Sequence, residues 1–227
     1  MKKSYKKVPH FTKRKYRLLI KLFAGDSDAA KIASIVGISR NAAERWINRF
    51  RARILHLAEQ EKLKDATSVQ VDETYFTPSR KIIPKHTLPS GEICVLGIIN
   101  DKGKVWAQIV DKANKLEIIP IVLACCSPGG LVCTDGAGVY KGLGKLGFDH
   151  RFISHADDEY SRYERGLCIT TNRIEGFWGC MKVRLAKFRG IKRENLHIHI
   201  AESVWRFNHR HDNLYKLLLH QFRVMPL

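Results

Sequence analysis

The segment that decides the fold runs from Val69 to Phe76 and reads Val-Gln-Val-Asp-Glu-Thr-Tyr-Phe. Its β-branched and aromatic residues are typical of a β-strand. Asp72 lies in the middle of this strand, where an acid is costly to bury without a partner. Because successive side chains point to opposite faces, Asp72 shares its face with Gln70 and Thr74, and Glu73 points the other way. Only one of the two acids can therefore join a polar site; Asp72 lies on the more polar face, and the choice between them rests partly on the resemblance described below.

Short apolar runs separated by turn residues follow this strand. Strands are expected at 93–100, 104–110, 131–134 and 152–153, and helices at 115–125, 139–146, 171–188, 196–208 and 214–222. Asn100–Gly103 is expected to be a hairpin turn, and the polar residues 154–168 a loop. Three strands, a helix, a strand, a helix and a strand match an RNase H-like α/β fold, with a mixed sheet flanked by helices.

The chain is predicted to contain two domains. Residues 1–60 are expected to form an all-α helix-turn-helix DNA-binding region, 61–68 a linker, and 69–227 an RNase H-like catalytic domain with C-terminal helices. The 227 residues are enough for one medium and one small domain.

Residues 29–48 fit a helix-turn-helix pattern. Gly37 suits the positive φ of the turn, and Ser39 is placed to cap the second helix. The second helix then presents polar side chains to DNA, namely Arg40, Asn41, Arg45 and Arg49. An ordinary helical hairpin with a solvated charged face is the alternative interpretation.

A second acid follows a different strand. Asp135 ends the apolar run Leu-Val-Cys-Thr and precedes Gly136. A carboxylate at the carboxyl end of a strand can reach into a crevice at the sheet edge. The alternative is that Asp-Gly forms only a turn.

The third acid lies on the helix that begins near Thr171. Glu175 and Lys182 are seven residues apart, which places them within about 20° of one face. Asn172 is three residues before Glu175 and lies about 60° to one side. The helix packs on the sheet through Ile174, Phe177, Met181 and Leu185.

Three acids on separate elements suit a site for two divalent metals about 4 Å apart. Hard cations such as Mg²⁺, with Mn²⁺ as a substitute, prefer carboxylate oxygens. Asp72, Asp135 and Glu175 are the predicted ligands, with Asn172 as a rival or partner of Glu175. Lys182, Lys187 and Arg189 are expected to contact DNA phosphates.

The charge balance favours a nucleic-acid partner. Forty Lys and Arg against 22 Asp and Glu leave a net charge of +18, which indicates phosphate contacts. The six cysteines include no C-x-x-C pair, so free thiols and a reducing cytoplasm are expected. No run is long and apolar enough to span a membrane, and no signal peptide is recognised.

Four ordered blocks resemble the DDE-type transposases of bacterial insertion sequences, most closely the ISXO-like branch. The blocks are Val-Asp-Glu-Thr-Tyr-Phe, Thr-Asp-Gly-x3-Tyr, Asn-x-Ile-Glu-x-Phe-Trp-x3-Lys and Glu-x2-Trp-Arg-Phe-Asn, between Val71 and Asn208. The resemblance implies an RNase H-like fold, a metal-dependent acidic triad and DNA substrates carrying terminal inverted repeats. Two departures from the family pattern are Thr170, where relatives often carry His, and the absence of a zinc ribbon.

Two alternatives remain open at this stage. One is a nuclease or junction resolvase on the same fold, and the other is a helix-turn-helix regulator without catalysis. Since transposition joins two DNA ends, a homodimer or larger oligomer is expected by analogy.

Overall fold

The computed structural model describes residues 12–77, 92–154, 158–188 and 190–224. Its contacts divide the chain into two compact units, Ile54–Asn208 and Met1–Arg53 together with His209–Leu227. In the described residues, the first unit is a mixed sheet flanked by helices, and the second is helical.

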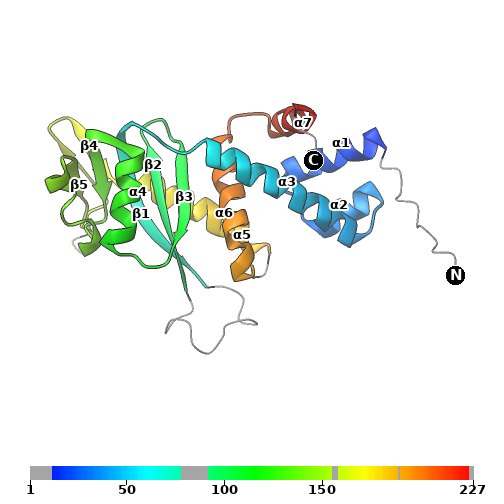
Figure 1. Cartoon of the computed structure of the whole chain (residues 1–227), viewed down its shortest axis with the longest axis horizontal. Coiled ribbons are helices and arrows are strands. Elements are labelled where there is room, and N and C mark those ends of the chain that lie inside the picture. The colour runs from blue at the N-terminus through cyan, green and yellow to red at the C-terminus, as the bar shows by residue number, and fades with distance from the viewer. Residues whose placement is uncertain (1–11, 78–91, 155–157, 189, 225–227) are drawn as a thin grey trace. The chain divides into compact units, whose positions relative to one another are not determined.

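The larger described sheet of the first unit has the spatial order β3-β2-β1-β4-β5. Its strands are β1 (Ala66–Phe76), β2 (Ile93–Asn100), β3 (Val105–Val110), β4 (Cys126–Thr134) and β5 (Asp149–Phe152). β1, β2 and β3 pair antiparallel, whereas β4 runs parallel to β1 and β5 runs parallel to β4. This mixed sheet (Figure 1) agrees with the predicted order of strands and helices.

The turn between β2 and β3 forms as predicted. The Gly103 amide donates to the Asn100 carbonyl at 3.0 Å. Gly103 has φ 72°, which glycine adopts without steric penalty. The Asn100 side chain also accepts from the Lys104 amide at 2.9 Å, so the turn sets the register of the hairpin.

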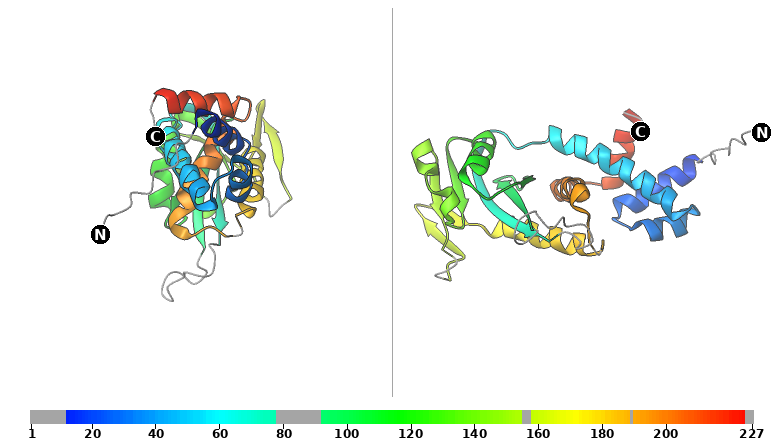
Figure 2. Two further views of the ribbon diagram at one scale, coloured as in Figure 1. Left: turned by 90° about the vertical axis from the view of Figure 1, so that its right-hand side faces the viewer. Right: turned by 60° about the horizontal axis from the view of Figure 1, so that its bottom comes forward.

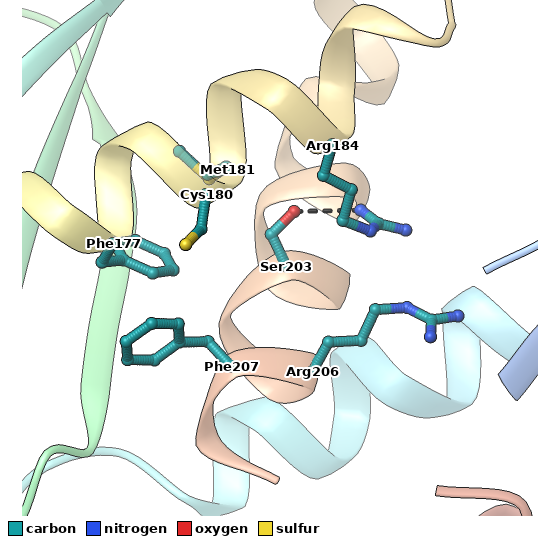
Figure 3. Close-up of a pocket in the computed structure, with 7 residues that line it drawn as sticks. All are labelled: Phe177, Cys180, Met181, Arg184, Ser203, Arg206 and Phe207. Atoms are coloured by element: carbon teal, nitrogen blue, oxygen red, sulfur yellow. Dashed lines mark hydrogen bonds between the residues drawn. The ribbon is translucent and has the colours of Figure 1, made fainter. Parts of the chain in front are cut away.

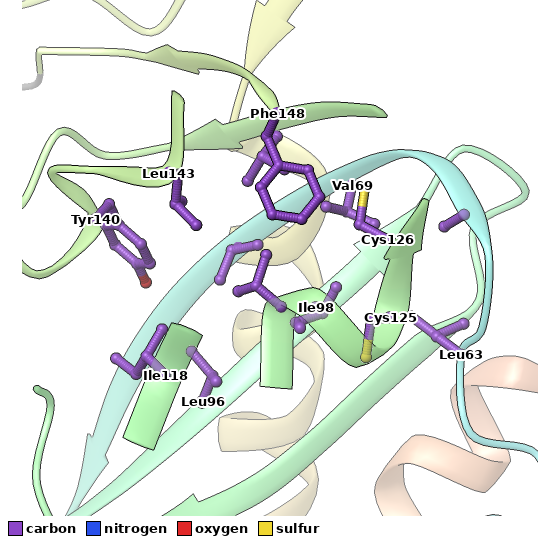
Figure 4. Packing of buried hydrophobic residues seen from close by; sticks show 14 of the residues in the cluster. Leu63, Val69, Leu96, Ile98, Ile118, Cys125, Cys126, Tyr140, Leu143 and Phe148 are labelled. Carbon is purple, nitrogen blue, oxygen red and sulfur yellow. The ribbon is translucent and has the colours of Figure 1, made fainter. Parts of the chain in front are cut away.

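Helices cover both faces of this sheet (Figure 1). They are α4 (Lys115–Cys125), α5 (Asn172–Ala186) and α6 (Arg193–Asn208). Leu96 and Ile98 of β2 pack with Ile118 of α4 (Figure 4). Val95 and Ile99 of the same strand pack on the other face, with α5 and α6. Because β2 is covered on both sides, it is apolar over nearly its whole length.

One predicted helix takes a different form. Residues 139–146 were expected to be one helix, but the structure has two short 3-10 helices, η2 (Gly138–Tyr140) and η3 (Leu143–Leu146). Gly142 lies between them with φ 112°. This backbone conformation interrupts a right-handed helix, and only glycine adopts it readily.

The predicted loop at 154–168 was wrong in its second half. The structure has an antiparallel hairpin there, made of β6 (Ser161–Glu164) and β7 (Leu167–Thr170). Its turn residues Arg165 and Gly166 have φ 51° and 79°. Two positive φ values suit a two-residue hairpin turn, but Arg-Gly is not one of the dipeptides that announce it.

The hairpin leads directly into α5 (Figure 2). Ile169 of β7 is fully buried and packs with Cys133 and Ile153 beside the larger sheet. Thr170 bridges the two segments, because its hydroxyl donates to the Tyr160 carbonyl at 3.1 Å and accepts from the Asn172 amide at 3.1 Å. The start of α5 is therefore anchored through the hairpin.

A buried ion network joins α5 to α6. The Glu202 carboxylate is fully buried and lies 2.6 Å from Arg184 Nη2 and 2.9 Å from Arg206 Nε. Arg184 also donates to Ser203 Oγ at 2.9 Å (Figure 3). Arg184, Ser203 and Arg206 line a cavity of about 160 Å³ together with Phe177 and other residues.

The second unit contains α1 (Lys13–Ala24), α2 (Ala29–Val36), the first part of α3 (Arg40–Gln60) and α7 (Leu214–Val224). Gly37 ends α2 in the left-handed conformation, with φ 69° and ψ 55°. Ser39 Oγ accepts from the Ala42 amide at 3.2 Å and so caps α3. Both features lie where the sequence predicted a turn and a helix cap.

The C-terminal helix α7 groups with the N-terminal helices, whereas the sequence assigned it to the catalytic domain. The Phe222 ring of α7 stacks on Phe50, with 4.7 Å between the ring centroids. Strand β1 also begins at Ala66, inside the segment 61–68 that was expected to be a linker. The packing partner of such an apolar helix end is set by long-range contacts, and the sequence of the helix itself does not specify it.

The six cysteines are free thiols, as expected. Four are buried and two are exposed, namely Cys94, Cys125, Cys126 and Cys133 against Cys168 and Cys180. In the part of the chain that the structure describes, no helix has the length and apolarity needed to cross a bilayer.

Substituting Glu202→Gln removes the shared charge of the buried network and leaves two buried guanidinium groups around an amide. We expect the free energy of unfolding to fall by roughly 3 kcal/mol, since breaking a buried ion pair leaves the remaining charge buried without a counter-charge. Urea unfolding measures this change. Glu194→Gln on the same helix is the matched control, because its ion pair with Lys192 is exposed and its expected effect is within about 0.5 kcal/mol.

Candidate active site

The two strand acids lie beside one another because of the register of β1 and β4. These parallel strands pair Gln70 with Cys133. Asp135 directly follows the last residue of β4, and continuing this register by two residues brings it beside Asp72. Neighbouring strands are about 4.8 Å apart, so the two acids lie near one another where β4 ends, in the interior of the strand order. The electrostatic interaction between them raises the pKa of Asp72.

Asp72 has a partner on α5. Trp178 Nε1 donates to Asp72 Oδ2 at 3.0 Å. Burial raises the pKa of Asp72 to about 6, the charge of Asp135 adds to the rise, and hydrogen bonds from the Glu73 backbone and Trp178 oppose it. Glu175 makes a further, smaller contribution in the raising direction. Asp135 and Glu175 therefore both lie within electrostatic reach of Asp72.

Glu73 lies on the opposite face of β1, as alternation predicted, but it remains within electrostatic reach of the site. The buried Tyr140 hydroxyl donates a hydrogen bond to its carboxylate. Burial raises the pKa of Glu73 to about 7, the Tyr140 hydrogen bond opposes that rise, and the charges of Asp135 and Asp72 add to it. The sequence prediction excluded Glu73 from the polar site, but Glu73 still interacts electrostatically with Asp72 and Asp135.

Asp135 is held by the turn that follows β4. Its Oδ1 accepts from the Ala137 amide at 2.9 Å, which folds the backbone into a tight Asx-type turn. Gly136 has φ 82°, a conformation that the turn requires and that glycine permits. Tyr140 lies five residues after Asp135, so its bond to Glu73 also ties this turn to β1.

The first turn of α5 is docked on β1. Gln70 Oε1 accepts from the backbone amides of Arg173 and Ile174 at 3.0 and 3.2 Å. These amides belong to the group that an α-helix leaves without an internal partner at its N-terminus. Gln70 therefore fixes the start of α5 two residues from Asp72 on the same face of the strand.

Glu175 and Asn172 occupy different environments on α5. Glu175 is half-buried, and its Oε1 accepts from the Thr171 hydroxyl at 2.6 Å. Asn172 is the exposed first residue of the helix. The charge of Glu175 contributes to the raised pKa of Asp72.

The predicted DNA contacts are exposed where the structure describes them. Lys182 lines a cavity of about 230 Å³ with Phe76 and Thr77 at the end of β1. The Lys187 ammonium lies 5.0 Å from the centroid of the Phe188 ring. Arg189 lies outside the described residues.

The polar side chains of α3 also face solvent. Arg40, Asn41, Arg45 and Arg49 are all exposed. Arg40 forms an exposed ion pair with Glu44 at 3.0 Å, and the Arg49 guanidinium lies 5.1 Å from the centroid of the Trp46 ring.

A family model described as the ISXO2-like transposase domain matches residues 62–208. The match covers most of the chain and includes both strand acids and the whole of α5. The chain belongs to the ISXO2-like transposase family. The resemblance found in the four sequence blocks is thereby confirmed.

Two solved structures are similar to this transposase over 97% of its chain and 81% of theirs. A pre-cleavage Mos1 transpososome is 12% identical with a TM-score of 0.36. A Mos1 transposase paired-end complex with the left transposon end is 13% identical with a TM-score of 0.38. Scores this low establish no shared architecture. No curated protein matches the sequence.

The acids of the transposase do not form a closed metal cage. Among the described residues, no three His, Cys, Asp or Glu side chains lie close enough together to hold a metal ion. The Glu175 carboxylate is engaged by Thr171, whereas Asp72 and Asp135 lie side by side. Asp135 raises the pKa of Asp72 more than Glu175 does, so Asp72 interacts more strongly with Asp135 than with Glu175.

Several residues that build the site were not identified as such from the sequence. Gln70, Trp178 and Tyr140 each bind a group of another element. Trp178 and Tyr140 lie within the ordered blocks and Gln70 directly precedes the first one, which gave a signal, because a polar residue beside a motif acid often has a structural partner. The identity of that partner is decided by tertiary packing.

Glu73→Gln should reduce the dependence of stability on pH. A folded-state pKa raised to about 7 from 4.5 means that the folded protein binds this proton more tightly than the unfolded chain does. The stability from this group is fully present below pH 4.5 and is lost as the pH rises through about 7. Urea unfolding in chelator at about pH 5 and about pH 8 should show a smaller loss for Glu73→Gln than for the wild type. An equal loss in both proteins would contradict the assignment.

Proposed function

We propose that this chain is the transposase of an insertion sequence, which binds the ends of the element and catalyses metal-dependent strand cleavage and strand transfer. The observation that carries the proposal is the pair Asp72 and Asp135, placed side by side on parallel strands in a member of the transposase family. Glu175 reaches the same site from α5.

The catalytic part is proposed to be RNase H-like. The order β3-β2-β1-β4-β5, with three antiparallel strands followed by two parallel ones, supports this assignment. So does the position of Asp135, which directly follows the carboxyl end of β4, beside Asp72 on the neighbouring parallel strand β1.

The acids fit a divalent cation such as Mg²⁺, with Mn²⁺ as a substitute. Two neighbouring carboxylates in a partly buried site, where burial and the charge of Asp135 raise the pKa of Asp72, favour a cation that offsets both charges. Asp72 and Asp135 would hold it, and Glu175 would complete the set. Bound metal supplies activation of the attacking oxygen and stabilisation of the leaving oxygen.

Of the two candidates on α5, we assign the third acidic role to Glu175. Its half-burial and its electrostatic link to Asp72 support this choice. Asn172 is exposed at the start of the helix and is proposed to contact DNA or the metal from the rim of the acidic site. Lys182, which lies two turns after Glu175, is proposed to bind a DNA phosphate.

Recognition of the element ends is assigned to the helical unit. The exposed Arg40, Asn41, Arg45 and Arg49 on α3 follow a glycine turn and a capped helix start, as in a helix-turn-helix. The net charge of +18 supports double-stranded DNA as the partner. Cutting and joining two ends would require two copies, so a dimer or larger assembly is part of the proposal.

Asp135→Asn should abolish metal-dependent cleavage, because it removes one ligand of the central pair. We expect less than about a hundredth of wild-type activity on DNA that carries the ends of the encoding element. The assay resolves cleaved from joined products in Mg²⁺. In the same assay Glu175→Gln should lose more activity than Asn172→Ala.

Asp111→Asn, an exposed aspartate just after β3, is the matched control and should retain activity. Full activity in Asp135→Asn would overturn the site assignment. Cleavage without joining in the wild-type protein would select a nuclease instead, and DNA binding without any metal-dependent cleavage would select a regulator.

Arg45→Ala should weaken binding to the element ends without affecting the fold, because Arg45 is exposed on α3. If Arg45 contacts a phosphate, the slope of log K against log salt should fall by about one. A filter-binding or anisotropy titration at several salt concentrations measures both quantities. Lys115→Ala, an exposed lysine at the start of α4, is the control, and an equal loss there would contradict a specific role for α3.

A further inference from the structure

The indole of Trp178 connects α5 to the first strand acid. Its ring is 4% exposed and lies 5.0 Å from the Phe177 ring, centroid to centroid. Its only polar atom, Nε1, donates to Asp72 Oδ2 at 3.0 Å. A buried indole N–H needs an acceptor, and here it uses one oxygen of a carboxylate that faces a second acid.

Gly97 makes room for this indole. It pairs with Asp72 across the β1–β2 ladder, on the strand that the indole covers. A Cβ atom at position 97 would lie 2.4 Å from Trp178 Cζ2 and 2.6 Å from its Cη2. It would also lie 3.0 Å from Ile174 Cδ1, so a side chain at this position would crowd two residues of α5. The absence of a side chain therefore lets the indole reach Asp72.

Gly97 otherwise has little reason to be glycine. It lies in the middle of β2, where glycine weakens a strand relative to residues with side chains. It is not among the glycines with positive φ, so the backbone conformation does not demand it. The close approach of the Trp178 ring accounts for the choice.

We propose that Trp178 is a positioning residue that orients the Asp72 carboxylate toward Asp135. The missing side chain at Gly97 leaves the space that the Trp178 indole needs. The proposal rests on the proposed function, in which Asp72 is a metal ligand. Hydrogen-bonded partners behind a ligand fix its orientation, and their loss weakens metal affinity roughly 10–100-fold.

The first test replaces Trp178 with phenylalanine, which keeps an aromatic ring on Phe177 and removes the N–H. Mn²⁺ binding to the full chain without DNA is followed by electron paramagnetic resonance of the free ion. We expect the half-saturating Mn²⁺ concentration to rise roughly 10–100-fold while the melting temperature changes little. Binding unchanged within about twofold would overturn the proposal.

The second test is a double-mutant cycle between positions 97 and 178. Gly97→Ala should weaken Mn²⁺ binding about as much as Trp178→Phe, because the new methyl displaces the indole. In the Trp178→Phe background the same glycine substitution should have little further effect, since the smaller ring leaves space. Independent effects that multiply would overturn the pairing of the two residues.

Two matched controls separate positioning from general packing. Gly179→Ala adds a methyl to the next residue of α5, where nothing lies within 4 Å of the new atom. Trp106→Phe removes an indole N–H from the half-buried edge strand β3. Both should leave Mn²⁺ binding unchanged, and a loss equal to that of Trp178→Phe in either would contradict a specific role.

A direct reading of the hydrogen bond is independent of metal and of activity. In protein labelled with ¹⁵N at the indoles, the Trp178 Nε1–H resonance is assigned by its absence in Trp178→Phe. Asp72→Ala should shift this resonance and leave that of Trp106 in place. An unshifted resonance would overturn the contact.

Failure of this proposal and failure of the proposed function give different results. If the wild type cleaves DNA and Trp178→Phe keeps normal Mn²⁺ binding, only the positioning role fails. If Mn²⁺ binding weakens as expected but the wild type neither cleaves nor joins element ends, the positioning role stands and the transposase function fails.

Discussion

The central constraint on the structure is that it must hold two carboxylates side by side although their charges repel one another. The register of β1 and β4 places Asp72 opposite Asp135, where partial burial and like charge raise the pKa of Asp72 to about 6. A fold without a use for this pair would separate the charges or replace one with an apolar residue, because burying them is unfavourable. The surrounding contacts are best understood as what holds the pair together.

Three contacts restrain the two acids from three directions. Trp178 reaches Asp72 from α5, and Gln70 fixes the start of that helix on the same strand. Tyr140 bonds to Glu73 and so ties the turn after Asp135 to β1. Each restraint joins elements far apart in sequence. The sheet, its helix and its loop are therefore hydrogen-bonded to one another around the acids.

Much of the fold was predictable because local patterns and packing agree. β2 and α4 were predicted with the bounds that the structure has, since an apolar strand between turn signals and an Asn-capped helix are locally specified. The 3-10 helices and the β6–β7 hairpin were not, because Gly142 and the Arg165-Gly166 turn act through backbone conformations that have weak sequence signals. Helix α7 joined the other unit through Phe222, a long-range choice.

The sequence by itself determined the identity of the acids, the strand alternation that separates Asp72 from Glu73, the helical phase of Glu175 and Lys182, and the family. Those properties follow from residue type and from the periods of strand and helix. Tertiary structure alone decided that Glu73 still influences the site, that Glu175 turns to Thr171, and that Gly97 admits the Trp178 indole. These depend on distances between atoms that only folding brings together, and no period along the chain encodes such distances.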